Sequence, residues 1–235
     1  KVTIERERIP IHSVVASFLL ENKVGYIKVI RFSATTALEF ESSMKDLAQK
    51  GATSVIVDIR GNGGGYLRSA TDMIDRFLDE GLGIVYTEGK ASPRIDYTSS
   101  YNGEYSSWPI AVLIDESSAS ASEIFAGALQ DNDRGLIVGR RSFGKGLVQE
   151  EFSVPNAISG AGALRLTVAR FYTPSGRAIQ KPYGEGVDYN HDYQDRIESG
   201  ELFLEDSIQH RDTVTFRTLL GRKVYGGGGI TPDIF

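Results

Sequence analysis

One serine and one lysine in this sequence have neighbours that suit catalysis. Ser120 closes a run of small residues directly before a stretch typical of a helix, and Lys145 lies between Gly144 and Gly146. A serine becomes a nucleophile when a base takes its proton. A lysine can be that base only while it is neutral, which requires burial or a nearby positive dipole to lower its pKa. The two residues together therefore suggest a nucleophile and a general base, 25 positions apart.

Taken singly, each of the two residues has another explanation. Ser120 and Glu123 are the residue pair of a capping box, so Ser120 alone is better explained as a helix cap. Residues 139–145 satisfy the pattern GxxxxGK, but a phosphate-binding loop of that type needs Ser or Thr next and then opens a helix. Here Gly146 follows and the next residues are typical of a strand. This argues against an NTPase.

A glycine run forms a third candidate feature. Residues 61–65, Gly-Asn-Gly-Gly-Gly, follow a short apolar run and precede a predicted helix. Glycines at such a junction form a phosphate cradle, a tight turn with positive φ, or an oxyanion hole in which backbone N–H groups approach a reacting carbonyl. The dinucleotide-binding pattern GxGxxG does not fit, because Tyr66 occupies its last position. The run alone does not decide among the three.

The histidines do not extend this set of candidates. His12, His191 and His210 lie neither in small-residue segments nor at strand ends, so a Ser-His-Asp triad is not supported. The spacing around His191 fits no common metal site, and a solvated loop explains it better. His12 and His210 are predicted to be surface residues. The sequence has no cysteine, which excludes Cys nucleophiles, disulfides and Cys-zinc sites.

The composition is that of a globular chain with a sizeable core. The 235 residues are 40% hydrophobic and 24% charged, with a formal net charge of −5. This mild acidity and the lack of a Lys/Arg run argue against nonspecific nucleic-acid binding. No apolar stretch reaches membrane-spanning length, and the first residues are charged and strand-like rather than a signal peptide.

Alternating strands and helices must position these residues. Helices are predicted over residues 36–50, 67–80 and 121–132, and Thr36 with Glu39 is predicted to cap the first of them. Strands are predicted over residues 14–20, 24–30, 53–59, 84–86, 95–97, 110–114, 136–138, 148–154 and 164–172. Residues 182–215 are polar, and we expect a surface excursion with a short helix there. This order indicates an α/β fold with an added β subdomain.

Four motifs and a closing segment have an order and spacing that point to one family. They are DIRGNGGG at residues 58–65, SASASEI at 118–124, AGALQD at 126–131, FGKGLVQ at 143–149 and the closing GITPD at 229–233. Taken together, they resemble the C-terminal processing peptidases, also called tail-specific proteases, which are serine peptidases with a Ser-Lys dyad. Order and spacing agree over roughly residues 13–181, which makes the signal specific.

The resemblance implies a role for each matching residue. Ser120 would be the nucleophile, Lys145 the general base and Gln149 the residue that orients the lysine. Backbone N–H groups would form the oxyanion hole. One would come from Ala121 and the other from a glycine of residues 63–65, where Gly64 and Gly65 are favoured without a choice between them. The acidic Asp131 would have a structural or supportive role. No metal, nucleotide or other cofactor is implied.

The resemblance also implies a fold and an activity. The fold would be a crotonase/Clp-protease-like α/β catalytic core with a β-rich N-terminal subdomain. The activity would be that of a serine endopeptidase that cleaves extended or unfolded proteins near their C-termini through an acyl-enzyme. Strand 164–172 would accept the polypeptide substrate by strand addition. The alternative is a non-catalytic peptide- or ligand-binding module on the same fold.

Domain organisation departs from the family in one respect. The family usually carries a PDZ domain before the catalytic core, and nothing here resembles one. We interpret residues 1–12 as the exit strand of a missing upstream PDZ-like domain, 13–181 as the core, 182–221 as a polar excursion forming a lid or interaction segment, and 222–235 as the closing loop and strand. The resemblance suggests export to the periplasm or cell envelope of a bacterium and is compatible with a homo-oligomer.

Overall fold

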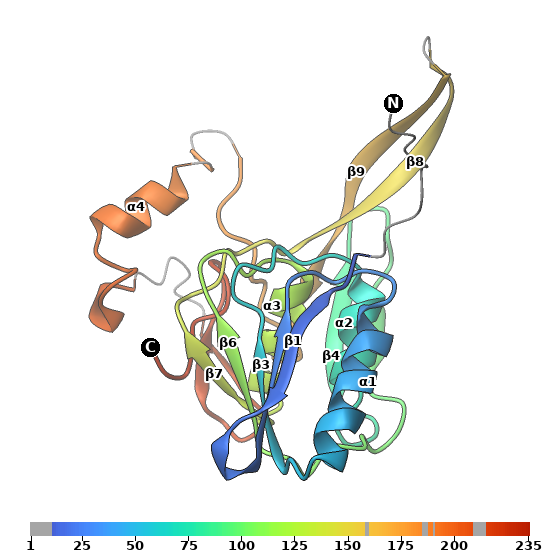
Figure 1. Cartoon of the computed structure of the whole chain (residues 1–235). Helices are drawn as coiled ribbons and strands as arrows, with labels where there is room; N and C mark the ends of the chain where they lie inside the picture. The colour runs from blue at the N-terminus through green and yellow to red at the C-terminus, as the bar shows by residue number, and fades with distance from the viewer. Residues whose placement is uncertain (1–10, 158–159, 185–187, 190, 209–214) are drawn as a thin grey trace, which may run out of the picture.

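A computed structural model defines the fold and describes residues 11–157, 160–184, 188–189, 191–208 and 215–235. The body is a five-stranded sheet of order β1-β2-β3-β6-β7 (Figure 1). Its strands are β1 (Val14–Leu19), β2 (Val24–Val29), β3 (Ser54–Asp58), β6 (Ile110–Ile114) and β7 (Leu136–Gly139). β1 is antiparallel to β2, and the other neighbours are parallel. The expected central parallel strand at 53–59 is thereby confirmed.

The β-rich N-terminal run is part of this sheet. β1 and β2 form a hairpin through the short 3-10 helix η1 (Glu21–Lys23), as predicted, and β2 pairs with β3. They occupy one edge of the main sheet rather than forming a separate unit. The predicted strand at residues 1–11 lies almost wholly outside the described residues.

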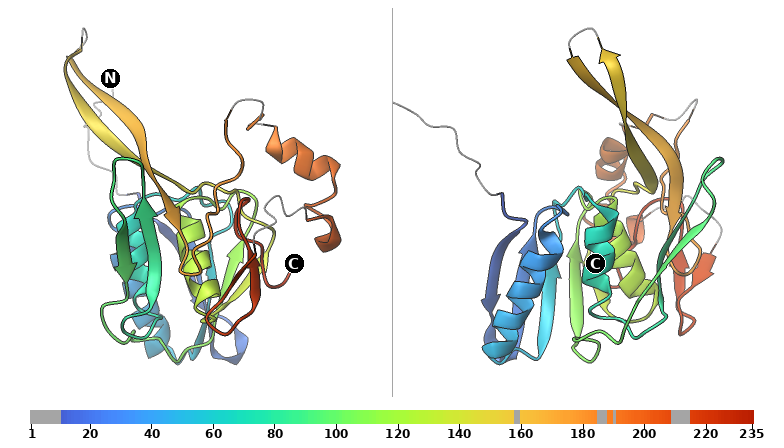
Figure 2. Two further views of the ribbon diagram at one scale, coloured as in Figure 1. Left: turned by 180° about the vertical axis from the view of Figure 1, so that it is seen from behind. Right: turned by 90° about the vertical axis from the view of Figure 1, so that its right-hand side faces the viewer.

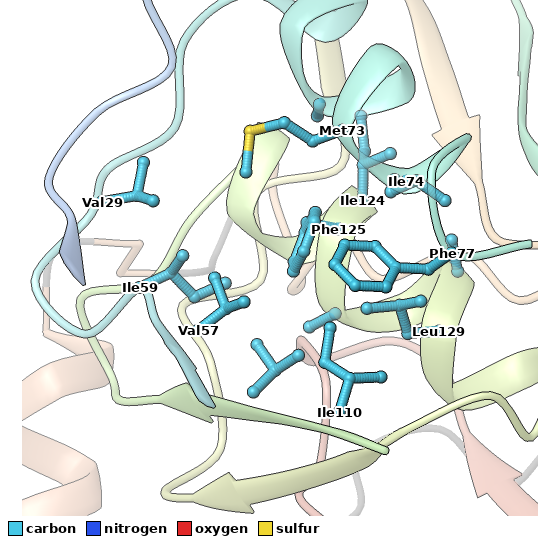
Figure 3. Packing of buried hydrophobic residues seen from close by; sticks show 14 of the residues in the cluster. Val29, Val57, Ile59, Met73, Ile74, Phe77, Ile110, Ile124, Phe125 and Leu129 are labelled. Carbon is cyan, nitrogen blue, oxygen red and sulfur yellow. The ribbon is translucent and has the colours of Figure 1, made fainter. Parts of the chain in front are cut away.

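Three helices complete the body. They are α1 (Thr36–Gln49), α2 (Leu67–Ile74) and α3 (Ala121–Asp131). α3 is buried along its whole length and contacts both β7 and β4, a strand of the second sheet. In the side view of Figure 2, α2 and α3 lie between the two sheets. All three predicted helices are confirmed, and the hydrophobic side chains of α2 and α3 meet those of the main sheet in one core (Figure 3).

The start of α1 differs from the prediction. Thr36 lies inside the helix, and Thr35 is the cap residue. The Glu39 carboxylate does not cap the helix, because it accepts hydrogen bonds from the backbone N–H groups of Ser13 and Val14. A tertiary contact to the start of β1 therefore replaces the predicted capping box.

α2 is shorter than predicted and ends at Ile74. Beyond it, the carbonyl of Arg76 accepts the N–H of Tyr105, and the N–H of Glu80 donates to the side chain of Asn102. In a helix that continued to residue 80 these two groups would bond to each other, so partners from a distant loop replace the helical hydrogen bond. Tertiary hydrogen bonds thus end the helix where the apolar pattern would continue it.

A second, four-stranded antiparallel sheet has the order β5-β4-β9-β8. Its strands are β4 (Gly83–Glu88), β5 (Ile95–Thr98), β8 (Leu147–Ala157) and β9 (Gly160–Tyr172). Within β9, only the last residues, 170–172, pair with β4, so the β8–β9 hairpin continues past β4. Figure 1 shows this hairpin projecting beyond the body. This sheet is the added β subdomain that the sequence predicts.

The C-terminal part contains one short helix and a small two-stranded sheet. The elements are α4 (Asp192–Glu198), the 3-10 helix η2 (Glu205–Ser207), β10 (Thr215–Arg217) and β11 (Lys223–Tyr225). The chain then returns to the main sheet, where Ile234 bridges to Val138 of β7. The predicted short helix and closing segment are present. Within the described residues, no helix is both long and apolar enough to cross a membrane.

Candidate active site

Three loops meet at one cavity of about 650 Å³. The glycine run comes from the connection of β3 to α2, and Ser120 comes from the connection of β6 to α3. Residues 140–146, here called the lysine loop, connect β7 to β8. The predicted site residues that line the cavity are Gly64, Gly65, Ser120, Ala121, Lys145 and Gln149. Because β3, β6 and β7 are parallel neighbours, their carboxyl ends bring the three loops to one edge of the sheet.

Ser120 has an unusual backbone conformation. Its φ is 56° and its ψ is −113°, a combination that L-residues rarely adopt. A conformation of this kind costs of order 1–3 kcal/mol and persists only where the surroundings enforce it. Ser120 is also the N-cap residue of α3, and its backbone N–H donates to Glu123, as the predicted capping box requires. Its strained backbone distinguishes it from an ordinary helix cap.

Asn62 is one of the residues that enforce this turn. It is completely buried, and its side-chain amide donates to the carbonyl of Val29. Its backbone carbonyl accepts the N–H of Ala119 and the hydroxyl of Ser122, which flank the serine. The glycine run and the serine turn are thus joined directly by hydrogen bonds.

Glu123 is the other residue that enforces the geometry, and it connects serine and lysine. One carboxylate oxygen, Oε2, accepts the backbone N–H of Ser120 at 2.8 Å and the backbone N–H of Lys145 at 2.8 Å. The other, Oε1, accepts the N–H of Gly144 at 2.7 Å and the hydroxyl of Ser142. A single side chain therefore holds the backbones of Ser120 and Lys145 side by side.

Burial raises the pKa of Glu123, and the hydrogen bonds it accepts oppose this rise. The sequence revealed only the local half of its role, the Ser-x-x-Glu spacing of a capping box. The Ser120 N–H bond fulfils that half. The contacts to the lysine loop span about twenty residues and leave no periodic signal, so sequence reasoning missed them.

The glycine run approaches Ser120 as closely as a backbone can. A Cβ atom at Gly64 would lie 2.8 Å from Ser120 Cβ and 2.5 Å from the carbonyl oxygen of Ala119. The φ of Gly64 is +95°, so glycine is required there for both steric and conformational reasons. At Gly65, a Cβ would lie 2.0 Å from the Phe32 carbonyl oxygen.

The backbone N–H groups of Gly65 and Ala121 at this junction have no acceptor among the described residues. Gly65 and Phe32 form a parallel β-bridge. In its two hydrogen bonds, the Phe32 N–H donates to the Gly64 carbonyl and the Tyr66 N–H donates to the Phe32 carbonyl. The Gly65 N–H therefore points away from Phe32. Ala121 is the first residue of α3, where N–H groups have no intrahelical partner. By contrast, the Gly64 N–H is bonded to the side chain of Asn62 at 2.9 Å.

Lys145 and Gln149 line the same cavity from the lysine loop and β8. Lys145 is half-buried, and its ammonium group makes no ion pair within the part of the chain that the structure describes. Gln149 is exposed, and no hydrogen bond joins it to Lys145 among the described residues. The two residues share a wall of the cavity, and the orienting role of Gln149 stays a prediction.

The remaining cavity wall is mostly apolar, with one ion pair on the projecting hairpin. Phe32, Leu67 and Ile124 contribute to the apolar wall, and Glu151 pairs with Arg165 at 3.2 Å. Strand 164–172 was predicted to be the strand that receives substrate. This strand, β9, pairs with β8 on one side, and its last residues pair with β4 on the other. The end of β9 is therefore in the interior of the sheet. The open edge that adjoins Lys145 is β8 instead.

The other residues that the sequence singled out lie away from the cavity. Asp131 forms an ion pair with Arg177 at 2.7 Å, and both side chains are completely buried. His12 is exposed near Glu39 at the start of β1, and His191 is exposed beside α4. His210 lies outside the described residues. Within the described part of the chain, no cluster of His, Asp and Glu has the composition of a metal site.

Asp58, at the end of β3, anchors the segment that leads into the glycine run. It accepts hydrogen bonds from the hydroxyl of Tyr26 at 2.7 Å, from Lys28 Nζ at 3.0 Å and from the backbone and guanidinium of Arg60. Burial disfavours the charged carboxylate, but these donors, Arg60 foremost, hold the pKa of Asp58 well below its usual range. Asp58 is thus expected to contribute stability that depends on pH.

Replacement of Asp58 by Asn should lower the free energy of unfolding at pH 7 by roughly 2–4 kcal/mol, because it replaces a buried carboxylate that accepts several hydrogen bonds with a weaker acceptor. The pKa of Asp58 is lowered by folding, so its contribution is complete above the unfolded value of about 3.9 and is lost as pH falls toward the folded value. Urea unfolding should show the difference between wild type and variant shrinking by about 1 kcal/mol at pH 3. A difference that is the same at both pH values would contradict this assignment.

Comparison with known proteins agrees with this geometry. The profile of Peptidase family S41 matches residues 23–192. A carboxyl-terminal-processing protease of Picosynechococcus sp. is 40% identical over 159 residues, which are 68% of this chain and 37% of that protein. A carboxy-terminal-processing protease of Bartonella bacilliformis is 40% identical over 184 residues, which are 76% of this chain and 41% of that protein. The chain thus spans about two fifths of the length of these relatives.

Solved structures give the same fold. A photosystem II D1 C-terminal processing protease superposes with a TM-score of 0.60 at 32% identity, covering 74% of this chain and 46% of that one. An S41 protease of Bacteroides fragilis superposes with a TM-score of 0.60 at 16% identity, covering 86% of this chain and 56% of that one. The second likeness concerns the fold alone. The expected α/β fold of this family is confirmed.

Proposed function

The chain belongs to peptidase family S41, and on that premise we propose that it is the catalytic core of a serine endopeptidase with a Ser-Lys dyad. The observation that carries the proposal is the shared carboxylate oxygen of Glu123, which receives the N–H groups of both Ser120 and Lys145. A structural capping box needs the first of these bonds and not the second. The second bond makes sense where serine and lysine act together.

In the proposed reaction, Ser120 Oγ attacks the scissile carbonyl carbon while neutral Lys145 Nζ takes the hydroxyl proton. The tetrahedral intermediate collapses to an acyl-enzyme, and the lysine returns the proton to the leaving amine. Water then attacks the ester by the same route in reverse and releases the new C-terminus. The placement of Ser120 at the N-terminus of α3 favours the negative charge that develops beside it.

We assign the oxyanion hole to the backbone N–H groups of Gly65 and Ala121. The structure supports Gly65 over Gly64 as the second donor, because the Gly64 N–H is already bonded to Asn62. Each such donor contributes roughly 3 kcal/mol to transition-state binding. The positive φ of Gly64 and its contact with the serine turn fix the distance between the two donors.

For the substrate, we propose an extended or unfolded polypeptide, cleaved near its C-terminus. β8 begins two residues after Lys145 and has a free edge, to which an extended peptide adds by backbone hydrogen bonds. The apolar wall formed by residues such as Phe32 and Ile124 would receive a side chain next to the scissile bond. The named relatives, which are carboxyl-terminal-processing proteases, support this substrate class.

The cellular setting belongs to the same proposal. We propose an exported enzyme of the bacterial periplasm or cell envelope, in which residues 13–181 and 222–235 form the core and an upstream PDZ-like domain precedes residue 13. Self-association of the core is compatible with this arrangement.

The rival proposal is a module that binds peptides on the same fold without cleaving them. A cavity lined by apolar side chains would serve that function as well. The strained backbone of Ser120 favours the enzyme, because such strain is stored where a nucleophile must be presented.

Incubation with an unfolded protein, followed by mass spectrometry of the products, tests the proposal. New termini should appear near the substrate C-terminus, and a serine-directed covalent reagent should label Ser120. Since only a neutral lysine accepts the serine proton, the rate should rise with pH. Full activity at pH 5 would contradict the dyad. Binding of the unfolded protein without new termini would favour the rival module.

A further inference from the structure

The segment that follows the family match carries a buried arginine that contacts the site. α4 begins at Asp192, the residue where the match ends, and contains Arg196. Although α4 is a short surface helix, the Arg196 side chain is only 2% exposed. A buried guanidinium is costly unless its donors are paired. The partners of Arg196 are therefore informative.

Arg196 bonds to the backbone of the lysine loop. One terminal nitrogen, Nη1, donates to the carbonyl of Ser142 at 3.2 Å, and the other, Nη2, donates to the carbonyl of Arg141. Both carbonyls lie three to four residues before Lys145. A planar fork bound to two consecutive carbonyls fixes the position of a loop more firmly than a single bond would.

Glu201 neutralises this contact. It is 3% exposed and accepts Arg196 Nε at 2.9 Å, and it also accepts Arg141 through both carboxylate oxygens at 2.7 Å. Arg141 in turn donates to the carbonyl of Gly228 in the closing segment. Burial and the neighbouring charge of Arg141 lower the pKa of Arg196, and Glu201 opposes this. One carboxylate thus joins Arg196 to Arg141, a residue of the lysine loop itself.

The opposite side of the lysine loop is held by Glu123. Ser142 donates its hydroxyl to Glu123, and Glu123 accepts the N–H of Lys145. Arg196 therefore reaches the backbone of the lysine through a continuous set of hydrogen bonds with two intermediates, Ser142 and Glu123. The loop is fixed between α3 on one side and α4 on the other.

A second contact from the same segment supports this arrangement. Lys181 Nζ lies 4.0 Å from the centre of the Phe143 ring and 3.3 Å from Asp192 of α4. Its backbone N–H donates to the carbonyl of Gly144 at 2.9 Å. The segment that leads into α4 thus contacts both Gly144 and Phe143, the two residues before Lys145.

We propose that α4 and Glu201 form a clamp on the lysine loop, with Arg196 as a positioning residue that keeps Lys145 opposite Ser120. The proposal rests on the peptidase function proposed above. It gives residues 192–201, predicted from the sequence as part of a lid or interaction segment, a fixed structural role. Residues outside the family match would then complete the catalytic geometry.

Two conservative variants test the clamp, Arg196→Lys and Glu201→Gln, with Glu198→Gln as the control on the exposed face of α4. Lysine keeps the charge but cannot bond both carbonyls, and glutamine removes the shared charge. We expect kcat for an unfolded protein substrate to fall roughly 10- to 100-fold in both variants, with KM changed less than about twofold, because the fault is in the placement of the base. The control should match wild type.

Hydrogen exchange provides a readout that does not depend on activity. Exchange at residues 140–146 should become roughly tenfold faster in both variants, while exchange in β3 and β6 stays unchanged. Unchanged loop exchange, or a rise in KM with unchanged kcat, would overturn the clamp. If the unaltered chain cleaves nothing, the peptidase proposal fails, and the exchange measurement by itself decides whether the clamp exists. Faster exchange throughout the core would show that Arg196 only stabilises the fold.

Discussion

Replacement of Ser120 by Ala is expected to abolish cleavage, with kcat falling roughly 10³- to 10⁶-fold, as it does when a member of a catalytic unit is removed. The same loss is expected for Lys145→Ala, because a serine without a base remains a weak nucleophile. The two effects should not add. Because serine and lysine act in one step, the double variant should be about as inactive as either single variant. At independent sites, the two losses of activity would multiply.

Stability separates this result from a loss of fold. Glu123 holds Ser120 through its backbone N–H, which alanine keeps, so the substitution should change the free energy of unfolding by less than about 1 kcal/mol. Ser117→Ala and Lys90→Ala, both at exposed positions, are matched controls that should retain full activity. Cleavage at the wild-type rate by either active-site variant, measured on an unfolded protein, would refute the dyad.

Replacement of Glu123 by Gln should reduce kcat/KM at least about 100-fold, because small displacements of catalytic groups have effects of this size. The carboxylate accepts four hydrogen bonds with two oxygens, whereas an amide has one oxygen and presents donors on its nitrogen. Wherever the amide nitrogen replaces a carboxylate oxygen, the backbone N–H groups or the hydroxyl bonded there would face another donor instead of an acceptor. Ser120 and Lys145 would then lose the anchor that joins their backbones.

The same change should lower the free energy of unfolding by roughly 2–4 kcal/mol, since Glu123 is fully buried. Glu116→Gln is the matched control. Glu116 pairs with Arg140, which is 41% exposed, so its loss should cost about 1 kcal/mol or less and leave cleavage intact. Chemical unfolding at pH 7 and steady-state kinetics measure both effects. Normal activity in Glu123→Gln would show that the carboxylate serves the fold alone.

Local sequence patterns were sufficient to predict most helices and strands of the fold. The apolar runs at 53–59 and 110–114 became the central parallel strands β3 and β6, because a strand buried on both faces must be apolar throughout. Periodic apolar residues likewise predicted α3. The errors arose where distant groups compete for backbone hydrogen bonds. α2 ends early because the loop that contains Asn102 and Tyr105 takes the two backbone groups that the next helical hydrogen bond would join.

Side-chain roles were predicted less completely. The sequence suggested Ser120, Lys145 and the glycine run as one site, and the structure places them around one cavity. It could not choose between Gly64 and Gly65, because the choice depends on the direction of single N–H groups. That direction is set by the bridge to Phe32 and by Asn62.

The sequence by itself predicted which residues have the chemistry for peptide cleavage and determined the order of the elements that carry them. It did so because residue type, glycine spacing and apolar periodicity are local properties. Only the tertiary structure decided how the proposed dyad is held. The carboxylate of Glu123 and the fork of Arg196 act across gaps of about 20 and 55 residues, and a hydrogen bond between such distant positions leaves no periodic signal.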